Sequence, residues 1–295
     1  MSGRLHLDPG FLRRLERLAI VARRTLKGAG PGERRSRRHG GTVEFADYRG
    51  YAPGDDTRRI DWYAYARLGH LFLKLYLEEQ DLAVHLLLDQ SASMGTGTPE
   101  KLDYARQLAL ALGYVALAAG DRVQVRAFRG GERGRPLGPL RGRNDLVRLI
   151  EHLEEDPEAA GRTSLAGAVR SFLAGHPSHG VVIVLSDLLD PEWEPALLRL
   201  RHSGHEPLVM QVLAPDELEP EVERDHELLD AETGEVVPVA LDQTAVAAYR
   251  AAVEAFLTRV ETTCTRSGIG WVLARTDVPL EELVLRAMRG RALLR

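Results

Sequence analysis

Five oxygen-bearing side chains in this sequence have types and spacing that could hold a metal ion. In "HLLLDQSASMG" an apolar run ends in an acid, and two hydroxyl groups follow at alternate positions. A threonine lies further along in "AGRTSLAGAV", and a second apolar run ends in an acid in "VLSDLLD". Hard oxygen donors that include few carboxylates suit Mg²⁺ or Mn²⁺. The candidate metal ligands are therefore Asp89, Ser91, Ser93, Thr163 and Asp187.

The same residues also have a purely structural interpretation. Ser91 and Ser93 could cap a helix at 99–119, and Thr163 could cap the next helix. The two aspartates would then be ordinary acids at strand ends. If the set is instead a metal site, two acids and three neutral hydroxyls would gain from one more carboxylate supplied by another group.

The elements that must position these residues alternate between strand and helix from residue 82 onward. Strands are predicted at 82–89, 122–128, 180–187, 206–214 and 269–275, and helices at 100–119, 143–155, 164–175, 192–202, near 244–266 and near 279–289. This alternation predicts an α/β fold with a doubly wound, mostly parallel, Rossmann-like sheet. The continuous apolar runs at 84–88 and 181–185 are typical of central strands, so Asp89 and Asp187 should meet at the carboxyl edge.

One segment departs from the alternation. "HELLDAETGEVVPVAL" (226–241) predicts a β-hairpin around the turn signal Glu232-Thr233-Gly234, within an insertion near 216–243. Because it follows the strand at 206–214, the hairpin should emerge at the same carboxyl edge.

The N-terminal part of the chain is basic. Residues 1–74 carry a net charge of +8 and the remaining 221 residues carry −12. An amphipathic helix is predicted at 8–27, an Arg-rich loop with "RRSRRHGG" at 28–41 and a strand at 70–79. We expect residues 1–80 to form a basic arm that packs on a main domain of residues 81–295. Nucleic-acid binding through the arginines at 34–38 is an alternative, but the loop has no aromatic residues for stacking.

Within this arm, "FADYRGYAPGDDTRRIDWYAYARLG" (45–69) is dense in acids, arginines and aromatic residues. Pro53-Gly54 predicts a turn, and Asp55 or Asp56 should cap a short helix that carries Arg58 to Trp62. The segment is either a structural clasp to the main domain or a docking surface for a partner.

Two resemblances follow from these motifs. The Asp89-x-Ser91-x-Ser93 set with the distant Thr163 and Asp187 resembles the metal-ion-dependent adhesion site of von Willebrand factor A domains. That resemblance implies that the hydroxyls bind the metal, that the aspartates act largely through water and that a partner's acid completes the shell. The stretch from Glu44 to Trp62, with the closing "SGIGWVLARTDVPLEELV", resembles the bacterial "domain of unknown function 58" family. Its members are often associated with MoxR-type AAA+ ATPases.

These observations predict a metal-dependent protein-interaction module and no enzyme. The expected partner is a protein that supplies an acidic residue, and the family resemblance implies a MoxR-type ATPase or its client. A Mg²⁺- or Mn²⁺-dependent phosphoester hydrolase is the alternative, but His85 lies in an apolar strand and is expected to be packed. No apolar run reaches membrane-spanning length, so we expect a cytoplasmic protein that does not bind membranes. The single cysteine, Cys264, excludes a disulfide within the chain.

Overall fold

The computed structural model of the chain describes residues 8–16, 44–77, 82–129, 132–133, 136–155, 159–219, 226–229, 231–232, 234–239 and 243–289. The chain divides into two units, one made of residues 1–23 with 82–295 and the other of residues 24–81. This division differs from the predicted boundary at residue 80, because the start of the chain groups with the α/β unit.

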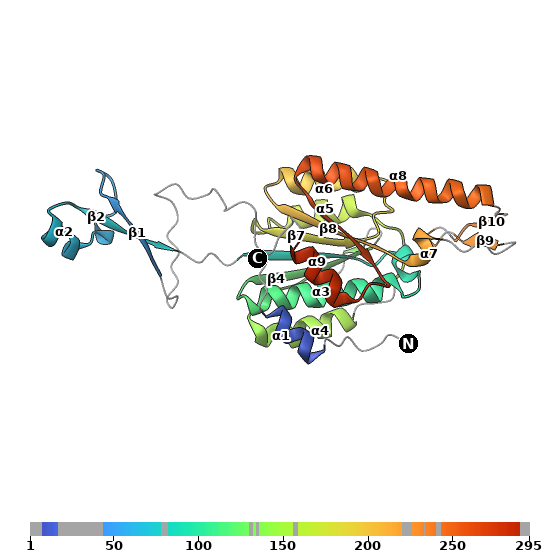
Figure 1. The fold of residues 1–295 in the computed structure, drawn as a ribbon, viewed down its shortest axis with the longest axis horizontal. Helices are drawn as coiled ribbons and strands as arrows, with labels where there is room; N and C mark the ends of the chain where they lie inside the picture. Colours follow the sequence, from blue (N-terminus) through green and yellow to red (C-terminus); the bar gives the residue numbers. More distant parts are fainter. Residues whose placement is uncertain are drawn as a thin grey trace. The chain divides into compact units, whose positions relative to one another are not determined.

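The larger unit is built on a mostly parallel sheet (Figure 1). Five parallel strands lie in the order β11 (Gly270–Arg275), β8 (Glu206–Leu213), β7 (Val181–Ser186), β3 (Ala83–Asp89) and β4 (Arg122–Arg129). At the β4 edge, β5 (Glu132–Arg133) and β6 (Leu137–Arg141) pair antiparallel with β4. The predicted parallel strands are confirmed, whereas β5 and β6 were not predicted.

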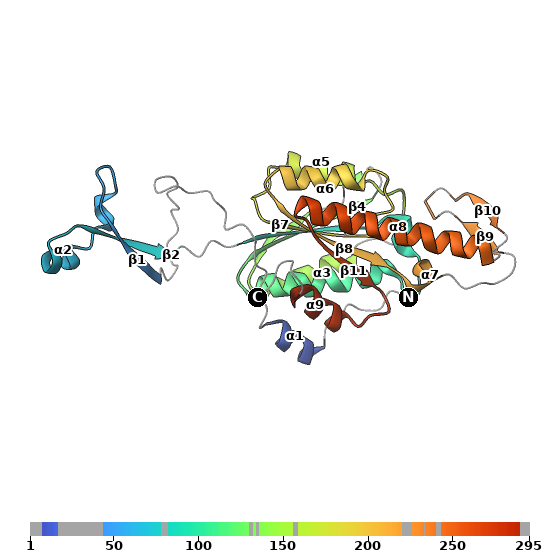
Figure 2. The same ribbon diagram turned by 45° about the horizontal axis from the view of Figure 1, so that its top comes forward.

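Helices cover both faces of this sheet (Figures 1 and 2). One face carries α3 (Lys101–Ala118) and α9 (Leu280–Arg289), with α4 (Leu146–Glu155) and α1 (Pro9–Leu15) packed against α3. The other face carries α5 (Leu165–Ala174), α6 (Trp193–His202) and α8 (Gln243–Ser267). Short helices lie at η2 (Ala92–Gly95), η3 (Arg143–Asp145) and α7 (Pro215–Leu218). The doubly wound α/β fold is therefore confirmed.

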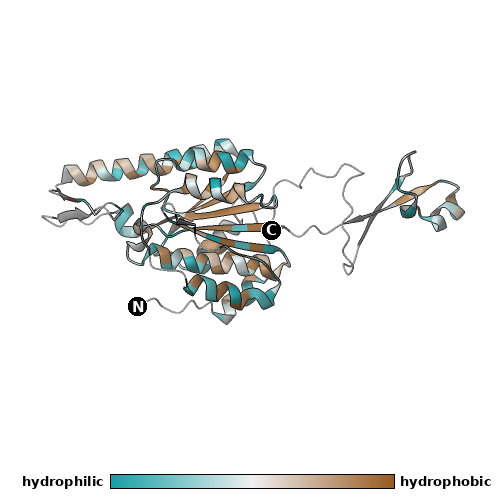
Figure 3. Ribbon diagram, turned by 180° about the vertical axis from the view of Figure 1, so that it is seen from behind, coloured by the Kyte–Doolittle hydropathy of each residue, from teal (hydrophilic) through white to brown (hydrophobic). Residues whose placement is uncertain are grey.

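The apolar strands bury both of their faces. Leu86 and Leu88 of β3 pack in the core on the α3 side, whereas Leu87 packs in the core on the α5 and α6 side. All seven residues of β3 and all six of β7 are buried, and the central strands are the most hydrophobic part of the ribbon (Figure 3). Continuous burial explains why these strands read as unbroken apolar runs rather than alternating ones.

The N-terminal helix is anchored to the α/β unit. Asp8 caps α1, because its Oδ2 accepts a hydrogen bond from the amide of Phe11 at 3.0 Å. The Arg14 guanidinium forms an ion pair with Glu281 of α9, and the Tyr114 hydroxyl of α3 donates to Glu16 at 2.7 Å. The predicted helix at 8–27 is thus confirmed over α1, and its remainder from residue 17 lies outside the described residues.

The smaller unit contains the dense segment of the N-terminal arm. Here β1 (Glu44–Gly50) pairs antiparallel with β2 (Phe72–Leu77), and η1 (Thr57–Arg59) and α2 (Trp62–Leu68) lie between them in sequence. Asp56 caps η1 and Asp61 caps α2, so two short helices replace the single helix predicted here. The strand β1 was not predicted, and the arginines at 34–38 lie outside the described residues.

Among the helices that the structure describes, none combines the length and the apolar character needed to cross a membrane.

Candidate metal centre at the carboxyl edge

The two acids predicted to bind metal lie where the direction of the sheet connections reverses. From β3 the chain passes through α3 to β4 on one side, and from β7 it passes through α6 to β8 on the other. Asp89 is the last residue of β3, and Asp187 directly follows β7. The register pairs Leu88 with Leu185, so both acids emerge at the same edge. In open α/β sheets the crevice at this reversal is the usual ligand site.

Asp89 is a fully buried carboxylate held by hydrogen bonds from neighbouring groups. Its Oδ1 accepts from the Ser91 amide at 3.0 Å, and its Oδ2 accepts from the Ser186 hydroxyl at 2.6 Å. Burial and then the nearby Asp187 carboxylate raise the pKa of Asp89 to about 7, although hydrogen bonds from Ser186 and Ser91 act in the opposite direction. An acid with a raised pKa at this edge is one that a bound cation would stabilise in its charged form.

The two serines place their hydroxyls side by side. Ser91 Oγ and Ser93 Oγ are 3.1 Å apart, and both residues are buried. Ser91 stands at the start of η2 without making a side-chain cap, and α3 is preceded by Glu100, which makes none either. The interpretation of Ser91 and Ser93 as helix caps is therefore wrong.

Backbone hydrogen bonds of neighbouring residues hold the loop of Thr163 at the same edge. The amide of Ala160 donates to the Gln90 carbonyl at 3.0 Å, and the amide of Ala92 donates to the Gly161 carbonyl at 2.9 Å. These bonds tie the loop of Thr163 to the loop of the serines. The cap of α5 is Ser164, so Thr163 is no helix cap either.

The five predicted residues are therefore not all in contact with one another. Hydrogen bonds link Asp89, Ser91 and Ser93, and the negative charge of Asp187 raises the pKa of Asp89. The side-chain partner found for Thr163 is a different residue, Glu232, to which its hydroxyl donates at 2.7 Å.

A buried ammonium group that sequence patterns did not indicate lies beside Asp187. Lys101, the first residue of α3, is fully buried, and its Nζ donates to Asp187 Oδ2 at 2.9 Å and also to Glu217 Oε1 of α7. Burial alone would lower the pKa of Lys101, but the Asp187 and Glu217 carboxylates outweigh it and raise that pKa. A lysine at a helix start gives no sequence signal for such a role, because lysines there are usually exposed.

The backbone after Asp187 has an unusual conformation. Leu188 has a φ of 62°, in the left-handed region that favours glycine, and its side chain is buried. The Leu188 amide donates to Ser186 Oγ at 3.0 Å, and the Leu189 amide donates to Asp187 Oδ1 at 3.2 Å. The turn therefore points both amides back at the edge and holds the Asp187 carboxylate in place.

The donor set fits a small cation that prefers oxygen. In octahedral Mg²⁺ sites with bonds of about 2.0–2.1 Å, adjacent ligand atoms lie about 2.9 Å apart, close to the 3.1 Å between the two serine hydroxyls. Within the described part of the chain, no three His, Cys, Asp or Glu side chains converge in a way that could hold a metal. Any cation here would depend on hydroxyl and water oxygens as well as on the acids.

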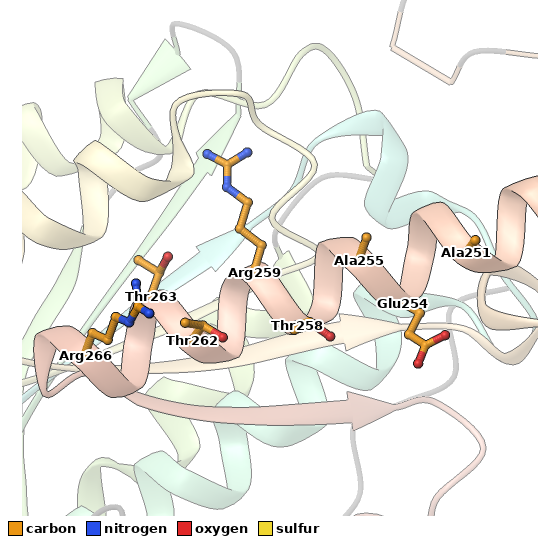
Figure 4. Close-up of a pocket in the computed structure, with 8 residues that line it drawn as sticks. All are labelled: Ala251, Glu254, Ala255, Thr258, Arg259, Thr262, Thr263 and Arg266. Atoms are coloured by element: carbon orange, nitrogen blue, oxygen red, sulfur yellow. The ribbon is translucent and has the colours of Figure 1, made fainter.

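Two other features lie away from this edge. His85 of β3 is buried, its Nδ1 contacts Gln124 Oε1 at 3.0 Å and its Nε2 contacts the Ser178 carbonyl at 2.9 Å, so the prediction of a packed histidine is confirmed. A shallow surface hollow runs along α8 from Ala251 to Arg266 (Figure 4). Small and charged side chains line it, and it includes none of the predicted site residues.

Comparisons with known proteins place the chain in a family. Uncharacterized proteins of Mycobacterium tuberculosis and Mycobacterium bovis are each 30% identical to it over 275 residues, which cover 92% of this chain and 86% of theirs. Among solved structures, the protein BatB from Bacteroides thetaiotaomicron is similar over 71% of this chain and 100% of its own, with 18% identity and a TM-score of 0.43. An aerotolerance-related membrane protein from Bacteroides fragilis is similar over 70% and 99%, with 18% identity and a TM-score of 0.41. Residues 47–259 match the family described as "Protein of unknown function DUF58", and the chain belongs to that family.

Proposed function

We propose that this protein is a metal-dependent protein-interaction module in which Mg²⁺ or Mn²⁺ at the carboxyl edge binds an acidic residue of another protein. The Ser91, Ser93 and Thr163 hydroxyls would hold the ion, and Asp89 and Asp187 would balance its charge. When bound, the ion supplies a Lewis-acidic position that a carboxylate oxygen can occupy. The proposal extends the resemblance to metal-ion-dependent adhesion sites.

The observation that carries the proposal is the uneven charge of the edge. The Lys101 ammonium contacts Asp187 and Glu217, and Asp89 lies near Asp187 without an ammonium contact in the described residues. When all four groups are ionised, two negative charges remain uncompensated by them. Burying carboxylates without compensation is unfavourable, and a divalent cation beside the adjacent serine hydroxyls would offset it.

We assign binding rather than catalysis to this edge. His85, one of the histidines considered as a catalytic group, is held through both ring nitrogens inside the sheet. As the partner we propose a MoxR-type AAA+ ATPase or its client, and as the location the cytoplasm. Both assignments rest on the expectations drawn from the sequence.

Thermal unfolding with and without Mg²⁺ or Mn²⁺ tests the metal. A cation at ten times its Kd should stabilise the folded state by about 1.4 kcal/mol, which raises Tm by about 3–6 °C for a unit of this size. Asp89→Asn and Ser93→Ala should lose this rise, whereas Asp145→Asn, at a half-buried acid that pairs with Arg148, should keep it. Equal rises in all four proteins would contradict a metal centre at this edge.

Partner capture tests the interaction. The purified protein should bind a MoxR-type ATPase in Mg²⁺, and both chelator and Ser93→Ala should abolish binding while the fold is retained by circular dichroism. Capture that survives both treatments would show that the interaction does not depend on the metal.

A further inference from the structure

An acid of the same chain already lies against one of the proposed metal ligands. The hairpin of β9 (His226–Leu229) and β10 (Val236–Val239) pairs Val236 with Leu229, which leaves Glu232 in the connecting turn. Glu232 Oε1 accepts two hydrogen bonds from Thr163, from its amide at 2.9 Å and from its hydroxyl at 2.7 Å. The turn of the hairpin is therefore held at the carboxyl edge, as the sequence predicted for the hairpin as a whole.

The two hydrogen bonds to Glu232 determine which part of the Thr163 hydroxyl could still bind a cation. Because the hydroxyl donates its proton to Glu232, its oxygen lone pairs are the part left to face a cation. Hydrogen bonds that end on a carboxylate are stronger than neutral ones. A hydroxyl that binds a cation also becomes a better donor, so metal binding and the Thr163–Glu232 contact should favour each other.

We infer that Glu232 blocks access to the candidate metal centre in cis: bound to the amide and hydroxyl of Thr163, its carboxylate lies next to the position on the ion that an acid of another protein would take. The hairpin must then withdraw before a partner's carboxylate can reach the ion. Glu232 is a positioning and blocking residue rather than a third carboxylate around the ion, in keeping with the described residues having no three-acid cluster. This inference rests on the proposed function.

Two acids of the segment after β8 lie at the carboxyl edge, which supports the blocking role of Glu232. Glu217 of α7 bonds Lys101, which in turn bonds Asp187, and Glu232 bonds Thr163. In both views the hairpin lies beyond α7 at the same end of the unit (Figures 1 and 2). Thr163 is thus linked directly, and Asp187 through Lys101, to the segment that follows β8.

The contact itself is tested without metal. Hydrogen exchange at the Thr163 amide should become about tenfold faster in Glu232→Ala, since that amide loses its charged acceptor. Glu235, an exposed acid just before β10 on the same hairpin, gives the matched control: Glu235→Gln should leave exchange at Thr163 unchanged. Unchanged exchange in Glu232→Ala would overturn the inference.

The blocking role of Glu232 is tested with Mn²⁺ and acetate. Mn²⁺ binding is followed by electron paramagnetic resonance, and water bound to the ion is followed by proton relaxation. Acetate, a carboxylate without a protein, should lower the relaxation enhancement in Glu232→Gln at concentrations at least tenfold below those needed in the wild type and in Glu235→Gln. Equal acetate sensitivity in all three proteins would overturn the inference and leave the proposed function standing. Absence of Mn²⁺ binding in the wild type, or binding that Asp89→Asn does not weaken, would overturn both.

Discussion

Removal of the buried ammonium of Lys101 measures how much its ion pairs with Asp187 and Glu217 contribute to the stability of the fold. In Lys101→Met the side chain keeps an unbranched apolar stem and loses only the position of Nζ, so little packing is lost and the change is mainly one of charge. Asp187, which is fully buried, would lose its ammonium partner, and Glu217 would lose the same partner. Breaking a buried ion pair by removing one member destabilises a fold by about 3–5 kcal/mol, so we expect a loss in that range.

Urea unfolding, followed by circular dichroism in chelator, measures this loss as a free energy of unfolding. Arg148→Met is the matched control, because it removes a cation from an exposed pair with Asp145 and should change stability by less than about 1 kcal/mol. Combining Lys101→Met with Glu217→Gln should cost at least about 1 kcal/mol less than the sum of the two single changes. If Lys101→Met were as mild as Arg148→Met, the reasoning that this ammonium neutralises buried acids would be refuted.

Three further predictions concern residues beyond the ion pair. Leu188→Ala should destabilise the fold by about 1 kcal/mol more than Leu188→Gly, because alanine keeps the penalty of a left-handed backbone that glycine avoids; the opposite order in urea unfolding would contradict the strain. Burial, His85 and His179 lower the pKa of His205 to about 4, so the unfolded state takes up the proton first and stability falls as pH drops from about 6.5 towards 4. His205→Gln should remove up to about 3 kcal/mol of that fall in unfolding experiments at pH 7 and pH 4.5, and an identical pH profile would exclude this cause. Burial raises the pKa of Cys264 to about 12, so this thiol should react with a thiol reagent only after the protein is denatured, and rapid labelling of the native protein would contradict that burial.

Sequence patterns predicted the parts of the fold that depend on periodic burial. The unbroken apolar runs of β3 and β7 fixed both the central strands and the edge at which Asp89 and Asp187 emerge. By contrast, β6 contains Gly138 and Pro139 and has no apolar run, so it forms through pairing with β4 rather than through its own propensity. Local patterns carry no information about such pairing between segments.

The candidate site was predictable in its ligand types but not in its neighbours. Asp89, Ser91 and Ser93 lie within one short motif, so their spacing could be read directly. Lys101, Glu217 and Glu232 reach the edge from three different elements, and their positions depend on how α3, α7 and the hairpin pack. The turn signal around Glu232 predicted a hairpin, yet nothing local indicated that its carboxylate would contact Thr163, 69 positions away.

The shared ammonium of Lys101 also constrains how this edge can change during evolution. Lys101, Asp187 and Glu217 come from the start of α3, the turn after β7 and α7, and replacing Lys101 by a neutral residue would leave the Asp187 carboxylate buried without its ammonium partner, whereas replacing Glu217 would leave the Lys101–Asp187 pair intact. Loss of the lysine should therefore be accepted only together with loss of the buried acid. Relatives that lack the lysine should also lack the acid at the position of Asp187, whereas the position of Glu217 should vary more freely when family sequences are aligned.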